Sequence, residues 1–158
     1  MGCDAGAFAT TVSDPRRPGR RLHRRDRRFG GVRVSVRTAR EVVELYNLVV
    51  WNERDFALAE ELMGDNVIRH DVGEAQNLTH RQAVQRIIDH WAMFETVRFD
   101  LNLVIAGDDG EHVTIVYESP MSFPDGSAIT ISSMEIFRVV DGRITEVWNC
   151  GYKQGVWA

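Results

Sequence analysis

Glu135 is the residue whose type and setting most directly suggest chemistry. It interrupts an apolar run, residues 128–140, whose alternating pattern predicts a β-strand. Carboxylates are rarely buried in such strands, and a carboxyl held among aromatic rings and away from water has a raised pKa. A raised pKa suits a proton donor or a base near neutral pH. The alternative is that Glu135 faces solvent on a half-exposed sheet.

A two-residue turn at residues 141–142, Asp-Gly, predicts a hairpin that follows the Glu135 strand. Counting back along a regular ladder places Glu135 opposite Trp148. Phe137 then shares this face, which gives Glu135 two aromatic neighbours. The same count places Asn149 on the opposite face, unless a β-bulge shifts the register.

His70 and Asp71 are the candidates for a second proton-transfer group. They are neighbours in a short predicted strand, residues 67–72, so only one of them can face a pocket unless the strand ends or bulges there. Asp71 is slightly favoured as the base. His70 titrates nearest to pH 7 and could be a base or a hydrogen-bond partner. Each could instead have only a structural or surface role.

Three other histidines, His80, His90 and His112, are expected in solvent. His80 and His90 lie ten residues apart on one helix, which does not match a metal-binding pair, so we expect no metal site.

Four further aromatic residues could line a pocket, although aromatic residues at these spacings belong to the core more often than to a ligand site. They are Tyr46, Trp51, Trp91 and Tyr117.

Three helices are predicted in the first half of the ordered chain. They begin at the capping residues Thr38, Asp55 and Thr79. Gly64 is expected to end the second helix, and the short strand at 67–72 precedes the third.

From Phe99 onward the apolar residues alternate with period two, and turns interrupt them at residues 107–110, 124–126 and 141–142. This pattern predicts a four-stranded antiparallel meander. The order of elements is typical of an α+β domain with helices packed on one face of a curved sheet, which leaves room for a pocket.

The charge distribution separates the first 37 residues from the rest. Residues 1–37 carry ten Arg and three Asp, a net charge of +7, whereas residues 38–158 carry −11. The first segment is expected to be a disordered Arg-rich tail, with a nucleic-acid arm or a targeting peptide as alternatives. No apolar run is long enough to cross a membrane, and two cysteines favour the reducing cytoplasm.

The element order, together with MEIFRVVDGRITEVWN at 134–149, resembles the NTF2-like superfamily, and more closely its SnoaL-like, or polyketide cyclase-like, members. The resemblance covers about residues 38–155. It implies a cone-shaped fold with three N-terminal helices on a curved, mainly antiparallel sheet, and a homodimer formed through the outer sheet face. It also implies an acid or base at Glu135 and a strand histidine at His70.

The first half also resembles ketosteroid isomerase, through NERD at 52–55 and HDVG at 70–73. That resemblance implies a general base at Asp71 and a protonated oxyanion-hole acid at Glu135. Asn47 stands where the isomerases have a tyrosine. Asn149 stands where limonene-epoxide-hydrolase-like enzymes have an acid.

These observations favour a cofactor-independent isomerase or cyclase that acts on a small apolar carbonyl compound. Asp71 or His70 would remove a proton, and Glu135 would stabilise the enolate or reprotonate it. The alternative is a non-catalytic binding or dimeric interaction module, which is favoured if these three residues do not converge on one cavity. The acidic domain argues against a nucleic-acid partner.

Overall fold

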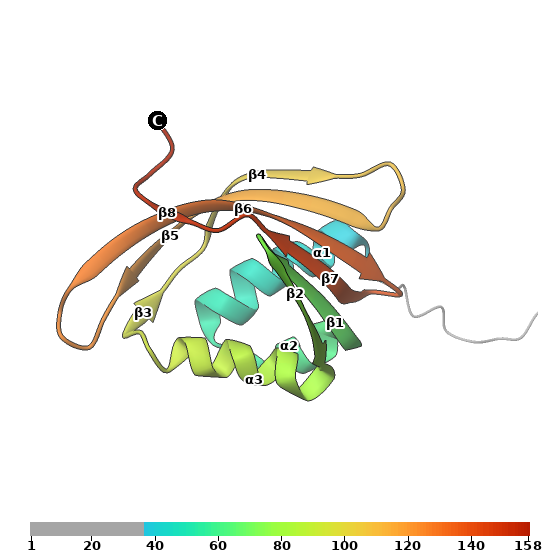
Figure 1. Ribbon diagram of the computed structural model, residues 1–158, viewed down its shortest axis with the longest axis horizontal. Helices are drawn as coiled ribbons and strands as arrows, with labels where there is room; N and C mark the ends of the chain where they lie inside the picture. The colour runs from blue at the N-terminus through green and yellow to red at the C-terminus, as the bar shows by residue number, and fades with distance from the viewer. Residues whose placement is uncertain (1–36) are drawn as a thin grey trace, which may run out of the picture. The chain divides into compact units, whose positions relative to one another are not determined.

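The computed structural model describes residues 37–158, which form three helices and a π-helical segment packed on one side of a curved sheet (Figure 1). The prediction of a disordered tail over residues 1–37 lies outside the described residues, apart from Arg37. The helical elements are α1 (Ala39–Leu45), the π-helical η1 (Tyr46–Trp51), α2 (Phe56–Leu62) and α3 (His80–Trp91).

The predicted caps begin the three α-helices. The side chains of Thr38 and Thr79 accept hydrogen bonds from the third backbone N–H of α1 and α3, and Glu41 and Gln82 complete the two capping boxes. Asp55 caps α2 by accepting from Leu58 N. The first predicted helix continues past Leu45 as η1, a change of helix type that the apolar periodicity did not indicate.

The sheet has eight strands in the described chain. They are β1 (Met63–Asp71), β2 (Glu74–Thr79), β3 (Thr96–Val97), β4 (Asp100–Ala106), β5 (His112–Ser122), β6 (Ala128–Val140), β7 (Arg143–Asn149) and β8 (Lys153–Gln154). The order is β2-β1-β7-β6-β5-β3, with β4 also paired to β5 and β8 to β6. Among the strands formed by residues 37–158, only β1 and β7 pair in parallel, so the fold is the predicted α+β class with a mixed, mostly antiparallel sheet.

The region around Gly64 differs from the sequence prediction. The second helix ends at Leu62, and Gly64 lies inside β1 rather than ending the helix. A Cβ at Gly64 would lie 2.9 Å from the carbonyl oxygen of Ile144, so the missing side chain lets β1 approach β7. Residues 74–79 form the edge strand β2, which the sequence analysis did not predict. Its polar composition follows from exposure on both faces.

The hairpin at residues 141–142 forms as predicted, with positive φ at both turn residues. A bulge then shifts its register, because Val139 pairs with Ile144 whereas Arg138 pairs with Glu146. Thr145 is the extra residue. The shift reverses the facing of every later residue of β7 relative to the regular count.

A second bulge lies in β4, where Leu101 pairs with Tyr117 and Leu103 with Val116. As a result Leu103 and Ile105 face outward and are exposed, although the sequence places them in phase with Leu101.

The core lies between the helices and the concave sheet face. Its largest fully buried side chains are Phe137, Leu62, Ile87, Ile115, Ile144, Val42, Val43, Val50 and Val113.

Candidate functional site

A cavity of about 330 Å³ remains where η1 and α3 cover the concave face of the sheet. Its polar lining residues are Tyr46, Asn47, Arg69, Arg86, His90, Tyr117, Glu135, Asn149 and Tyr152. Its apolar lining residues are Trp51, Met93, Phe94, Phe99, Met121, Phe123, Ile129 and Ile131. The cavity therefore has the size, the apolar walls and the few converging polar groups that are typical of small-molecule sites.

Glu135 projects into this cavity from β6 and is only 8% exposed. Asn149, its direct partner on β7, donates from Nδ2 to Glu135 Oε1 at 2.5 Å. Arg69 Nη2 on β1 lies 3.6 Å from the same oxygen. The carboxyl is thus fixed by both neighbouring polar groups and is not a solvent-facing side chain.

Burial is the main influence on the acidity of Glu135 and raises its pKa. The positive charge of Arg69 and the hydrogen bond from Asn149 act in the opposite direction but do not cancel the burial. A carboxyl with a raised pKa can hold a proton closer to neutral pH than an exposed glutamate, as the sequence analysis predicted for this residue.

One wall of the cavity is η1, whose π-type hydrogen bonds bring residues five apart onto one face. Tyr46 and Trp51 are such a pair, with ring centroids 6.3 Å apart in an edge-to-face contact. Burial raises the pKa of Tyr46, and it also raises that of Tyr117 on the opposite wall. Both phenols are therefore neutral hydrogen-bonding groups.

Asn47, next to Tyr46 in η1, is fully buried and lines the cavity. Its Nδ2 donates to Val43 O at 2.8 Å, whereas its Oδ1 has no hydrogen-bond partner among residues 37–158.

The third wall is α3, which supplies Arg86 and His90 one turn apart. His90 was expected in solvent, but it is half-buried in the cavity wall. Its Nδ1 lies 2.9 Å from the Arg86 carbonyl oxygen, which fixes Nδ1 as the donor. Burial, followed by the charge of Arg86, lowers the pKa of His90, so Nε2 is an acceptor on a neutral ring.

Neither predicted partner of Glu135 lines the cavity. His70 pairs with Trp148 across β1 and β7, and the two rings stack on the outer sheet face with centroids 4.9 Å apart. His70 Nε2 also lies 2.8 Å from Glu146. Asp71 lies on the Arg69 side of β1, 3.5 Å from Arg69 Nη2, but outside the cavity lining.

Three predicted wall residues are also placed elsewhere. The bulge at Thr145 moves Trp148 to the outer face, which reverses the prediction for Trp148, and brings Asn149 opposite Glu135, the register shift under which Asn149 was a candidate binding residue. Phe137 is buried in the core, outside the cavity lining, and contacts Tyr46 edge-to-face. Trp91 is buried on another side of α3, where Arg54 lies 4.1 Å from its ring. By contrast Tyr46, Trp51 and Tyr117 line the cavity.

Arg69, Arg86 and His90 are site residues that the sequence analysis missed. The i, i+2 spacing of Arg69 and Asp71 in one strand was the available signal for Arg69, since it places both on one face. For Arg86 and His90 the available signal was their i, i+4 spacing, which places both side chains on one face of the helix.

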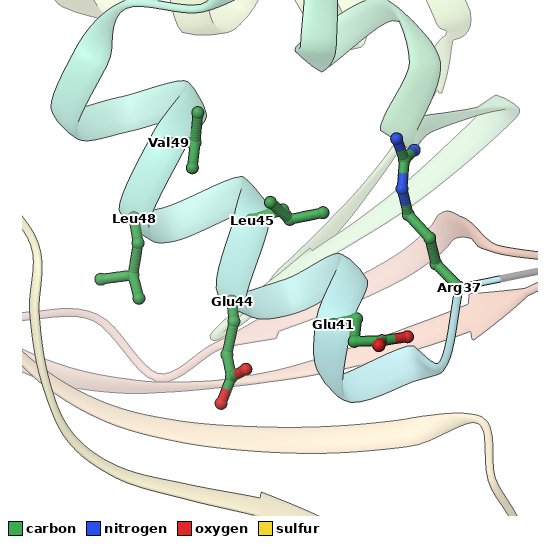
Figure 2. A pocket seen from close by; sticks show the side chains of 6 residues that line it. All are labelled: Arg37, Glu41, Glu44, Leu45, Leu48 and Val49. Atoms are coloured by element: carbon green, nitrogen blue, oxygen red, sulfur yellow. The ribbon is translucent and has the colours of Figure 1, made fainter.

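A second hollow lies along α1 and η1 (Figure 2). Arg37, Glu41, Glu44, Leu45, Leu48 and Val49 line it. Its charged residues have other partners, because Glu41 caps α1 and Arg37 pairs with Glu61 at 3.3 Å. None of the described residues that line this hollow is a buried ionisable group, so it is not a candidate site.

No helix formed by residues 37–158 is both long and apolar enough to cross a membrane. Within the same range, no three His, Cys, Asp or Glu residues cluster as they would around a metal ion.

Comparison with known proteins supports the family predicted from the sequence. A family model described as a SnoaL-like domain matches residues 42–147, and the chain belongs to this family. No curated protein sequence matches the chain.

Solved structures of the NTF2-like type share the fold at low identity. A limonene-epoxide-hydrolase-like epoxide hydrolase of Mycobacterium tuberculosis is 18% identical, with a TM-score of 0.61 over 73% of this chain and 82% of that one. A predicted polyketide cyclase of Pseudomonas putida is 19% identical, with a TM-score of 0.60 over 73% and 92%. SalBIII, an epoxide hydrolase/cyclase-like enzyme of pyran ring formation in salinomycin, is 20% identical, with a TM-score of 0.62 over 74% and 94%.

Proposed function

We propose that the cavity binds a small, largely apolar carbonyl compound and that Glu135 transfers a proton to or from it without a cofactor. The observation that carries this proposal is the carboxyl of Glu135, which is buried and has a raised pKa, yet lines an open cavity. A carboxyl in a cleft whose pKa is perturbed by burial and by a specific charged neighbour is a candidate functional group. The SnoaL-like family and its cyclase-like structural neighbours support a small-molecule role.

His90 is the second group of the proposed reaction, in place of Asp71 or His70. Its neutral Nε2 can accept a proton from the carbon next to the carbonyl group, and the C–H electron pair then forms the enol double bond. Protonated Glu135 donates its proton to the enolate oxygen or returns one to carbon. Return of the proton to a different carbon gives an isomerisation, and attack of the enol carbon on a second carbonyl of the same molecule gives a cyclisation.

Hydrogen exchange tests this chemistry without knowledge of the natural substrate. 2-Tetralone is an apolar ketone with exchangeable α-hydrogens, and NMR in D2O follows their replacement. We expect the protein to accelerate exchange above buffer and Glu135→Gln to lower the added rate about 100-fold, the usual contribution of a positioned acid or base. Glu60→Gln makes the same chemical change at an exposed position of α2 and should leave the rate unchanged.

A non-catalytic binding protein is the second candidate function. The observation that favours it is the placement of His70 and Asp71 outside the cavity, which leaves Glu135 as the one predicted catalytic group in it. The same experiment separates the two functions. Binding of 2-tetralone with no exchange above buffer would support the binding role, whereas accelerated exchange that is unchanged in Glu135→Gln would contradict the role proposed for Glu135.

We also propose that two copies pair through the outer face of the sheet. One row of outward residues crosses five strands through the pairings Ile105–Thr114–Ile136–Trp148–His70, and a neighbouring row contains Leu103, Val116 and Met134. Four of these are large exposed hydrophobic residues (Leu103, Ile105, Met134 and Ile136), and such a patch marks an interface. In sedimentation analysis the wild type should be a dimer, and Ile136→Glu should dissociate it into monomers. A monomeric wild type would contradict the pairing.

The cytoplasmic location expected from the sequence stays a prediction.

A further inference from the structure

The cavity has a polar end with more positive than negative charge. Two guanidinium groups, of Arg69 from β1 and Arg86 from α3, line it, and Glu135 is the one carboxylate among the lining residues. Because the pKa of Glu135 is raised, this carboxylate carries less of its charge than an exposed one would near neutral pH. The net charge of the side chains that line the cavity is therefore positive.

The two arginines differ in how their charge is balanced. Arg69 Nη2 lies 3.5 Å from Asp71 and 3.6 Å from Glu135, so two carboxylates flank it. The guanidinium of Arg86 has no carboxylate oxygen within 4.0 Å among residues 37–158. It is half-buried, and the nearby charge of Arg69 adds repulsion. A sheltered cation without a counter-ion costs stability, so this site is suited to receive an anion.

Asn47 does not add to this cation. Its Oδ1 accepts no hydrogen bond from the described residues, but the atom is fully buried, so a ligand in the cavity does not reach it. Arg86 is therefore the polar group that a ligand that is hydrocarbon throughout would leave without a partner.

The remaining walls are apolar and aromatic. Phe94, Phe99, Phe123, Ile129 and Met93 surround the part of the cavity formed by the end of α3, the start of β4 and the turn before β6. These side chains match a ring or chain of hydrocarbon, which gains from leaving water.

We propose that the ligand is an amphiphile with an apolar body and one acidic group, a carboxylate or an acidic enol, whose anionic oxygen is bound by Arg86. This inference rests on the proposed small-molecule function of the same cavity and adds the class of ligand. Arg86 is then a specificity-determining residue, since it distinguishes an acid from a neutral compound of the same shape.

Two matched probes test the inference: 2-naphthoic acid, which is ionised at pH 7, and 2-naphthamide, which has the same body without the charge. Isothermal titration calorimetry gives both dissociation constants at pH 7. We expect the wild type to prefer the acid by about tenfold or more, since hydrogen bonds to charged groups are stronger than neutral ones. In Arg86→Gln the preference should fall below about threefold while binding of the amide changes little.

Two further variants separate a direct contact from general effects. Arg81→Gln removes the same charge from an exposed position of the same helix and should keep the preference. Arg86→Lys keeps the positive charge and should keep part of the preference for the acid. This variant tests the role of Arg86 even if Arg86→Gln folds poorly.

Equal binding of the two probes by the wild type overturns the inference and leaves the proposed function standing. An equal loss of preference in Arg81→Gln also overturns it, because the effect would then be long-range charge alone. Failure of both probes to bind the wild type overturns the inference and the proposed function together.

Discussion

Asn149 lies directly opposite Glu135 across the β6–β7 ladder and donates to its carboxylate oxygen at 2.5 Å. The pair exists because of the bulge at Thr145, since a regular hairpin would place Trp148 opposite Glu135. The side-chain oxygen of Asn149, Oδ1, accepts from Gly151 N at 2.6 Å, which fixes the amide orientation. Glu135 therefore faces a positioned donor rather than an aromatic ring.

Replacing this donor by a carboxylate should make stability depend on pH. In Asn149→Asp the Gly151 N–H keeps its acceptor, but two carboxyls share one site, and ionising both is unfavourable. The folded-state pKa of one of them rises, so stability is lost as pH increases. We expect the cost to be about 1–3 kcal/mol larger at pH 8 than at pH 5 in urea unfolding. Asn77→Asp, on the exposed strand β2, should show no such pH-dependent loss.

Glu135 itself should destabilise the fold at higher pH. Its folded-state pKa is raised above the ordinary value of 4.5, so its contribution is most favourable below that pH and is lost as pH rises through the folded-state pKa. The unfolding free energy of Glu135→Gln, relative to wild type, should therefore increase from pH 4 upward and then level off. The height of the plateau gives the shift at about 1.4 kcal/mol for each pKa unit. A flat difference between the two proteins would contradict a raised pKa.

Replacement of His90, but not of His70, should lower the rate in the proton-transfer assay. His90→Gln removes the acceptor Nε2 from the cavity wall and should lower the added 2-tetralone exchange rate at least tenfold. His70→Gln should leave the rate unchanged, because His70 stacks on Trp148 outside the cavity. It should instead cost about 1 kcal/mol of stability through the lost stacking and the contact with Glu146. Loss of exchange in His70→Gln would contradict this assignment.

The sequence predicted those parts of the fold that depend on local chemistry. The capping boxes at Thr38 and Thr79 and the Asp-Gly turn each use side-chain or backbone preferences of adjacent residues, and all three form as predicted. Glu135 could be identified because a carboxylate in an apolar strand is conspicuous.

The rest of the site depends on contacts that no local pattern encodes. The bulges at Thr145 and Asn102 each reverse the facing of the following residues, and a simple alternation count has no means to detect them. Strand β2 has no hydrophobic face, so its polar sequence indicated a loop. Arg86 and His90 line the cavity only because α3 crosses the open side of the sheet.

Gly64 should be essential for the placement of Arg69, which follows it in β1. A Cβ at this position would lie 2.9 Å from Ile144 O and 3.3 Å from Asn66 O, both of them backbone atoms that cannot move without shifting β1 from β7. We expect Gly64→Ala to lower the unfolding free energy by about 1–3 kcal/mol. Because the parallel pairing with β7 positions Arg69 beside Glu135, the same variant should raise the pKa of Glu135 further, as measured by carboxyl NMR titration. Ala75→Gly, on the exposed edge strand β2, perturbs the neighbouring β-ladder without touching this contact and should leave that pKa unchanged. A Gly64→Ala protein with wild-type stability and an unshifted Glu135 would show that β1 is not held to β7 by this close approach.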